Sequence, residues 1–257
     1  MNRPTRSGRV GANLPAARTG ETMEHDDWTR AAQEECRRLL ILLDELTPEE
    51  WRAPTDCEGW DVHAMVAHLA GAAQWAATLR EMRRQMRAGK HLLPDADSVD
   101  GMNEVQVRER AERTPTELVA ELAEAAPRAV RARARLPRVV RALPVPFGPP
   151  LGTKPLGYLM DRILTRDVWL HRVDLCRATD RPLELTAGHD GRIIADVVDE
   201  WAALHDQPYA LTLTGPAGGR WQHGDGGEAI EVDAVEFCRI LSGRAPGTGL
   251  LTTRVNF

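Results

Sequence analysis

Residues 156–178 read LGYLMDRILTRDVWLHRVDLCRA. Apolar side chains recur in this stretch every three or four positions, which is the spacing of the buried face of an α-helix. Asp167 and His171 lie one turn apart on that same face. A carboxylate on an apolar face has to be paired, hydrogen-bonded or bound to a cation, because burial of an unpaired charge is unfavourable. The pattern therefore predicts a helix that carries a polar site into the core.

Most of the chain before this helix is also predicted to be helical. Apolar spacing predicts a first helix over 28–46, and TPEE at 47–50 is a capping pattern that starts a short helical turn. A second long helix is expected over 61–87, and a helix broken in two over 99–136. The segment 143–155, LPVPFGPPLGTKP, is predicted to be a proline-stiffened connection, because proline has no N–H to donate within a helix.

The pattern changes near residue 180, where short alternating segments replace the long helical ones. Strands are predicted at PLELT, YALTLTG, GRWQHG and EAIEV (182–186, 209–215, 219–224 and 228–232), and helices at 190–204 and 233–243. The predicted fold class is therefore α+β, with a four-helix bundle followed by a small α/β unit.

This change of pattern also predicts the domain division. Residues 1–22 are basic and rich in Gly, Pro and Ala, without the apolar segment of a secretory signal, so we expect a disordered extension. Met23 offers an alternative translation start. The helical bundle is expected over 23–180 and the α/β domain over 181–257.

The composition excludes several classes of function. The net charge is −5, so the chain lacks the basic field that attracts nucleic acid or anionic membranes. It has no run of about 18 apolar residues, the length needed to cross a bilayer. The four cysteines form no CxxC pair, which favours a reducing compartment. We therefore expect a soluble cytoplasmic protein, and the composition gives no indication of its chemistry.

A metal site is one interpretation of the polar pair in 156–178. Side chains at i and i+4 are close enough to hold one cation. The motif AHLAG in the helix expected at 61–87 supplies His68, which borders the apolar face of that helix. His68, Asp167 and His171 would then form a set of two imidazoles and one carboxylate. Three protein ligands leave one coordination position open, as in catalytic sites. Zinc suits this set, and iron, nickel or manganese would also accept it.

Other interpretations of these residues stay open. Asp167 and His171 also fit a simple intrahelical ion pair, and His68 fits a core histidine that donates to a backbone carbonyl. Cys57 precedes the helix at 61–87 closely enough to approach the site, but its small apolar side chain favours ordinary packing. Trp60 is expected in the core or in the wall of a pocket.

Three segments resemble the mycothiol-dependent maleylpyruvate isomerase family, which belongs to the DinB-like metal-binding four-helix-bundle superfamily. CEGWDVHAMVAHLAG at 57–71 is similar to the segment of that family that ends in a metal-binding histidine. RDVWLHRVDLCRATDRP at 166–182 resembles the segment in which a carboxylate precedes a histidine by four residues. Residues 211–251 resemble the small C-terminal domain, which is sterol-carrier-like. The resemblance extends over roughly residues 24–257.

The resemblance implies a site and its cofactors. It assigns metal ligation to His68, Asp167 and His171, with Zn²⁺ as the expected divalent cation. The family pattern has Glu at the position of Asp167, so the ligand here is one methylene shorter. Mycothiol, a cysteine-based thiol of actinobacteria, is the implied cosubstrate. Arg244, in LSGRAPG, is a candidate to hold an anionic group of the substrate or the thiol, and capping of the preceding helix is the alternative.

The resemblance also implies a reaction. A divalent cation lowers the pKa of a coordinated thiol, and the resulting thiolate would attack an electrophilic small molecule. Addition, bond rotation and elimination would give cis–trans isomerisation, whereas retention of the sulfur would give S-transfer. Two alternatives stay open: a metal-dependent hydrolase with water in place of the thiol, and a non-catalytic protein that binds a metal or a small ligand.

Overall fold

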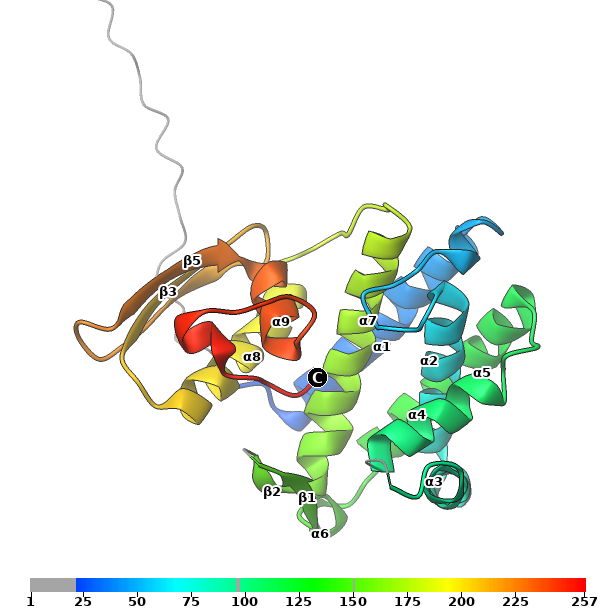
Figure 1. The fold of residues 1–257 in the computed structure, drawn as a ribbon. Coiled ribbons are helices and arrows are strands. Elements are labelled where there is room, and N and C mark those ends of the chain that lie inside the picture. Colours follow the sequence, from blue (N-terminus) through cyan, green and yellow to red (C-terminus); the bar gives the residue numbers. More distant parts are fainter. Residues whose placement is uncertain (1–21, 96–97, 150) are drawn as a thin grey trace, which may run out of the picture.

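The computed structural model describes residues 22–95, 98–149 and 151–257. The extension predicted at 1–22 therefore lies, except for Thr22, outside the described residues. The described chain forms a helical part followed by a smaller part with a three-stranded sheet (Figure 1). This arrangement confirms the predicted α+β fold class. The division at residue 180 stays a prediction.

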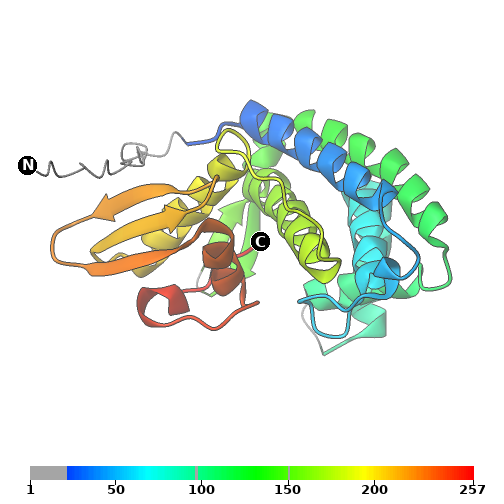
Figure 2. The ribbon, with the colours of Figure 1, turned by 90° about the horizontal axis from the view of Figure 1, so that it is seen from above.

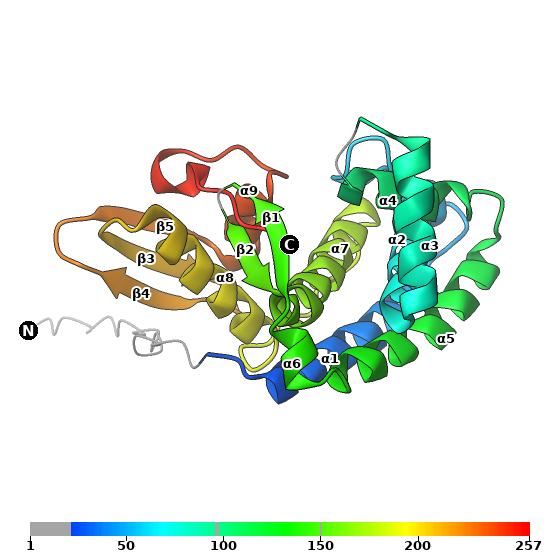
Figure 3. The ribbon, with the colours of Figure 1, turned by 90° about the horizontal axis from the view of Figure 1, so that it is seen from below.

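Four long helices form the frame of the helical part. They are α1 (His25–Asp44), α2 (Val62–Ala77), α5 (Pro115–Ala134) and α7 (Leu164–Ala178). Helices α1 and α5 lie side by side, with α7 packed against α1 and α2 packed against α5, so that α2 and α7 face each other across the bundle (Figures 2 and 3). The remaining helical elements of this part are η1 (Glu50–Arg52), α3 (Leu79–Leu92), α4 (Ser98–Arg108), α6 (Arg138–Arg141) and the π-helical turn η2 (Tyr158–Ile163).

Local sequence signals begin several of these helices. Thr114 starts α5 with a reciprocal capping box, in which its hydroxyl accepts from the Glu117 N–H and the Glu117 carboxylate accepts from the Thr114 N–H. Pro115 follows at the first helical position, where its missing N–H has no partner to lose. Asp61 caps α2 by accepting from the Ala64 N–H at 2.8 Å. These caps satisfy backbone donors that the helices themselves leave unpaired.

The single helix predicted at 61–87 is wrong. The chain breaks at Thr78, which has extended backbone angles (φ −148°, ψ 142°), and continues as α3 in a new direction. The Thr78 hydroxyl accepts from the Glu81 N–H at 3.2 Å and so caps α3. A threonine followed three residues later by glutamate is a capping pattern, and here it overrides the helical propensity of its neighbours.

The connection predicted at 143–155 is instead a hairpin. Strands β1 (Pro144–Gly148) and β2 (Gly152–Pro155) pair antiparallel. Gly148 and Gly152 have φ of 71° and 66°, which allows the chain to reverse between the strands. Proline is tolerated because a two-stranded ribbon consists only of edge strands, whose outer N–H groups need no partner.

The second part of the chain combines α8 (Asp190–His205), α9 (Ala234–Ser242), the short η3 (Gly249–Thr252) and one sheet. The strands are β3 (Tyr209–Thr214), β4 (Gly219–His223) and β5 (Glu228–Asp233). Strand β3 lies in the centre, antiparallel to β4 and parallel to β5. Asp233 caps α9 through Val235 and Glu236, and Gly243 ends it with φ 94°, as expected for a helix over 233–243.

The strand predicted at 182–186 is wrong. This described segment lies outside both sheets. Its leucines, Leu183 and Leu185, pack instead against buried apolar clusters of the chain. The segment ends where the Thr186 N–H donates to the Asp190 carboxylate at 2.7 Å, at the start of α8. No strand of the described part of the chain pairs with this segment. Its alternating apolar residues therefore hold the connecting segment against the helices.

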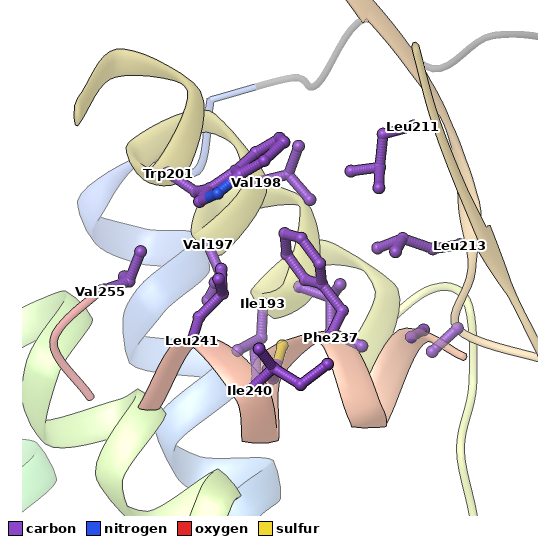
Figure 4. Close-up of a cluster of buried hydrophobic side chains, with 14 of the residues drawn as sticks. Ile193, Val197, Val198, Trp201, Leu211, Leu213, Phe237, Ile240, Leu241 and Val255 are labelled. Carbon is purple, nitrogen blue, oxygen red and sulfur yellow. The ribbon is translucent and has the colours of Figure 1, made fainter. Parts of the chain in front are cut away.

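The two parts share one apolar core. Trp201, Phe237 and Leu241 fill the space between α8, α9 and the sheet, together with Leu211 from β3 (Figure 4). The same cluster continues through Trp28 of α1 and Trp169 and Val173 of α7, and this continuity places the second part firmly against α7. Among the described residues, no helix has the length and the apolar character that crossing a lipid bilayer requires.

The turn between β3 and β4 is closely packed at Gly218, and a substitution there tests this contact. A Cβ atom on Gly218 would lie 2.1 Å from the backbone oxygen of Leu213, so alanine at position 218 must displace backbone. We expect Gly218→Ala to lower the free energy of unfolding by about 1–3 kcal/mol, measured by chemical denaturation. Gly188→Ala is the control, since no atom outside its chain neighbours lies within 4 Å of its added Cβ. Equal stability of the two variants would contradict this packing.

Candidate metal centre

The structure brings His68, Asp167 and His171 together across the bundle. The Asp167 carboxylate lies between the two rings, with Oδ1 at 3.3 Å from Nε2 of His171 and Oδ2 at 3.7 Å from Nε2 of His68. One ligand atom from each residue lies within 4.8 Å of the other two. Asp167 and His171 come from α7 and His68 comes from the facing helix α2, as the sequence pattern predicts. Metal ligation by the three stays a prediction.

The site is closed on one side and open on the other. His68 and His171 are only 5% and 6% exposed, whereas the Asp167 side chain is 23% exposed. Trp60 covers the imidazoles, with its ring centroid 5.0 Å from that of His68 and 6.3 Å from that of His171. Trp60 therefore occupies the wall position that the sequence analysis allowed, and a ligand would approach from the Asp167 side.

Asp174 orients His171. The Nδ1–H of His171 donates to Oδ2 of Asp174 at 3.1 Å, and Asp174 is fully buried. The Arg244 guanidinium donates to both oxygens of the same carboxylate, from Nε at 2.8 Å and from Nη2 at 2.7 Å. With Nδ1 acting as donor, the Nε2 lone pair of His171 is directed to the site. This carboxylate–histidine arrangement is typical of metal-binding imidazoles.

Two buried glutamines orient His68. The Nδ1–H of His68 donates to Oε1 of Gln106 at 2.8 Å, Nε2 of Gln106 donates to Oε1 of Gln85 at 2.9 Å, and Nε2 of Gln85 donates to the Gly71 carbonyl at 3.0 Å. The chain has only one direction, because a carbonyl cannot donate and the last acceptor is a backbone carbonyl. Nδ1 of His68 must therefore carry the proton, and Nε2 is left as the acceptor.

That Nε2 atom supplies the observation that tests the fit of a metal. It is buried and makes no hydrogen bond within the described part of the chain. A buried polar atom without a partner is unusual and calls for an ion or a ligand. Two imidazole nitrogens and one carboxylate oxygen are a donor set that zinc and other divalent transition metals accept. The residues present therefore fit a divalent cation.

The charges of the site are strongly coupled. Burial raises the pKa of the Asp167 carboxyl, but the two imidazoles outweigh burial and hold this pKa well below its usual range. Burial lowers the pKa of His171, but Asp167 and Asp174 outweigh it and raise the pKa well above 6.5. His171 and Arg244 likewise keep the pKa of the buried Asp174 below its usual range. Without a metal, the site therefore holds a proton on His171 at neutral pH.

Cys57 packs against the apolar core of the bundle, as predicted, and also approaches the site. Its Sγ is 3.9 Å from Oδ2 of Asp174 and 3.5 Å from Nη2 of Arg244. Asp174, Gln106 and Gln85 also contribute to the site, although none of them was predicted there. Asp174 had a signal, since it lies three residues after His171 on the same helical face. The two glutamines had none, because their contacts depend on how α3 and α4 pack.

Arg244 follows α9 and reaches back to α7. Its side-chain donors bind Asp174 and contact Cys57 rather than capping α9, whose Ile240 carbonyl accepts from Arg254 instead. Nη1 of Arg244 makes no hydrogen bond to any described residue. The guanidinium therefore retains one free edge beside the site.

A second group of potential ligands is satisfied by other means. Glu35 lies 2.5 Å from Nε2 of His189 and also accepts two hydrogen bonds from Arg172. Asp190 accepts from Arg172 and from Arg38. Because the arginines already neutralise both carboxylates, this cluster ties α1, α7 and α8 together rather than presenting a cation site.

A protein family and solved structures match this chain. Residues 32–176 match the family model described as mycothiol maleylpyruvate isomerase N-terminal domain. The crystal structure of the mycothiol-dependent maleylpyruvate isomerase is similar, with a TM-score of 0.58 and 18% identity over 87% of this chain and 90% of that chain. A mutant of the same enzyme matches over the same shares, with a TM-score of 0.57 and 17% identity. No curated protein matches the sequence.

The glutamine chain provides a test of the centre. Gln106→Leu keeps the side-chain volume but removes the acceptor for Nδ1 of His68, so the ring loses its fixed tautomer. We expect the affinity for Zn²⁺ to fall about 10- to 100-fold, measured by competition with a chromogenic chelator. Gln33→Leu, on the exposed face of α1, is the control and should leave the affinity unchanged. Wild-type affinity in Gln106→Leu would show that the amide chain does not orient the ligand.

The proton on His171 provides a second test. A metal can bind its Nε2 only after that proton leaves, so binding should release about one proton at neutral pH. Affinity should rise with pH throughout the range below the raised pKa of His171 and level off above it. Calorimetry in buffers of different ionisation enthalpy measures the release. A binding enthalpy that is independent of the buffer would contradict this assignment.

Proposed function

The chain belongs to the mycothiol maleylpyruvate isomerase N-terminal domain family, and from that membership we propose a metal- and mycothiol-dependent enzyme that adds the thiol to an electrophilic small molecule. It is an enzyme of the isomerase or thiol-transferase kind. The observation that carries the metal part of the proposal is the buried Nε2 of His68, which has no partner among the described residues and faces Asp167 and His171.

The proposed metal ligands are His68, Asp167 and His171, and Zn²⁺ is the proposed ion. When bound, such a cation lowers the pKa of a thiol at the centre, so that the thiol reacts as a thiolate at neutral pH. Asp167 is one methylene shorter than glutamate, so a cation held by it would lie correspondingly closer to the backbone of α7. The protein supplies activation and orientation of the external thiol rather than a covalent nucleophile of its own.

The surrounding residues have distinct tasks. Asp174 and Gln106 hold the two imidazoles with Nε2 directed inward. Trp60 shields the imidazoles from water on one side, which strengthens electrostatic interactions at the centre. The free edge of Arg244 is the proposed binding group for an anionic part of the substrate or of mycothiol, because a guanidinium donates to a carboxylate with two N–H groups.

The proposed reaction begins with attack of the thiolate sulfur on a carbon of a conjugated double bond. A carbon–sulfur bond forms and the π electrons move to the conjugated carbonyl. Rotation about the resulting single bond followed by loss of the thiolate gives the isomer and regenerates the thiol. Protonation of the adduct without loss of the sulfur gives an S-conjugate, which is the transferase outcome. We place this chemistry in the cytoplasm, which fits the four free cysteines of the chain.

Metal content and thiol binding test the proposed function together. We expect the wild-type protein to bind one equivalent of Zn²⁺ and His68→Ala to lose it, measured by elemental analysis after dialysis. His63→Ala is the matched control on α2, since its Nε2 contacts the Arg113 carbonyl at 2.7 Å and not the site. The zinc-loaded wild type should bind mycothiol saturably in calorimetry, and His68→Ala should not.

Each contrary result has a distinct meaning. If both histidine variants kept the metal, or if both lost it, the ligand assignment would be contradicted. Stoichiometric zinc without saturable mycothiol binding would contradict the thiol chemistry and favour hydrolysis with water as the nucleophile. Zinc and thiol binding without turnover of electrophilic substrates would favour a binding protein.

A further inference from the structure

A narrow crevice of ≈ 50 Å³ runs between the four long helices and reaches the candidate metal centre. Its walls are mainly alanine, leucine and valine side chains from α1, α2, α5 and α7. Small side chains leave this space open where the helices would otherwise close. Asp167 lines the crevice, so the crevice adjoins the exposed side of the centre.

Besides Asp167, two polar side chains interrupt the apolar walls. Arg133 of α5 is only 8% exposed, and its guanidinium makes no hydrogen bond or ion pair within the described ranges. Thr165 of α7 is 1% exposed, and its hydroxyl has no hydrogen-bond partner there either. The two come from different helices and line the same crevice.

The charge of Arg133 is not compensated by its neighbours. The electrostatic neighbours of the guanidinium are Cys36 and Asp161, and burial lowers its pKa despite them. Asp161 is already engaged by Arg141 and His25, and burial raises the pKa of the Cys36 thiol to about 11, so Cys36 is neutral. Arginine stays charged in proteins, and a buried charge without a partner is strongly unfavourable. The carbonyl end of α5 offsets only part of this penalty.

We propose that Arg133 and Thr165 form a carboxylate-binding subsite for a slender organic acid whose hydrocarbon part lies along the crevice. The guanidinium would pair with the carboxylate and the Thr165 hydroxyl would donate a third hydrogen bond. The apolar walls suit a hydrocarbon chain and offer few partners for the hydroxyl groups of a sugar-bearing thiol. The ligand is therefore the electrophile and not mycothiol, and only this identification rests on the proposed function.

The subsite explains why the chain retains an unfavourable residue. A buried unpaired cation lowers the stability of the free protein, and a ligand carboxylate would supply the missing partner. A structural arginine would behave in the opposite way, because its removal would break contacts and lower stability. The effect of a substitution on stability therefore distinguishes a binding role from a structural one.

Binding of hexanoate, with its neutral analogue hexanamide, tests the subsite on the full chain with and without zinc. We expect saturable hexanoate binding in calorimetry. The affinity should be about 10- to 100-fold lower for hexanamide than for hexanoate, and Arg133→Met should lower the affinity for hexanoate by a similar factor. This is the range for loss of a hydrogen bond to a charged group. Thr165→Val should also weaken hexanoate binding. Without ligand, Arg133→Met should unfold at a higher temperature than the wild type. Arg131→Met, on the exposed face of α5, is the control and should change neither property.

Equal affinity for hexanoate and hexanamide would overturn the proposal, and so would unchanged hexanoate binding in Arg133→Met together with a lower unfolding temperature. If Arg133→Met does not fold, Thr165→Val and the comparison of acid with amide decide the question. His68→Ala separates this inference from the proposed function, because it removes a metal ligand outside the crevice lining. Hexanoate binding that survives in His68→Ala supports the subsite even where the metal assignment fails.

Discussion

The hydrogen bonds to the Nδ1 atoms of His68 and His171 are the constraint on which the site depends. Each bond commits one ring nitrogen as a donor and thereby directs the other, Nε2, at Asp167. The partners differ in character, since Gln106 is a neutral amide and Asp174 is a carboxylate held by an arginine. The two aspartates beside His171 raise the pKa of that imidazole, and Nε2 of His68 has no hydrogen-bond partner among the described residues. The three side chains form an incomplete hydrogen-bond network that fits the donor set of a divalent cation.

Helix α7 connects this centre to the second part of the chain. Asp167, His171 and Asp174 of α7 face the candidate site. The buried arginines of the same helix pair with carboxylates of α1 and α8. Arg166 is fully buried and pairs with Asp196 and Glu200 of α8, at 2.6 Å and 2.8 Å. Arg244, which follows α9, completes the environment of His171 through Asp174. The sheet-containing part therefore contributes to the site in the bundle, because its Arg244 supplies a positive charge there.

The uneven satisfaction of buried polar groups separates structure from function in this molecule. In the arginine–carboxylate clusters at the junction, carboxylates neutralise the charges of the buried arginines, as stability requires. Among the buried side-chain atoms of the described residues that lack a hydrogen-bond partner, Nε2 of His68 lies at the centre and Oγ1 of Thr165 lines the crevice, whereas others lie elsewhere, such as Nε1 of Trp75, Nε1 of Trp221 and Nε2 of His205. The unpartnered atoms of His68 and Thr165 differ from the others in lying beside ionisable groups and an open crevice, which is why they are the ones we assign to ligand binding.

Local spacing by itself determined a large part of this structure. It placed Asp167 and His171 on one face of one helix, and it began α5 and α9 at their caps, because helical period and capping depend on residues only a few positions apart. Tertiary packing decided the rest. The meeting of His68 with the α7 pair, the amide chain through Gln106, and the approach of Arg244 all depend on distances between elements that no local period specifies. The hairpin at 144–155 and the absent strand at 182–186 have the same cause, since a segment becomes a strand only where a partner edge is within reach.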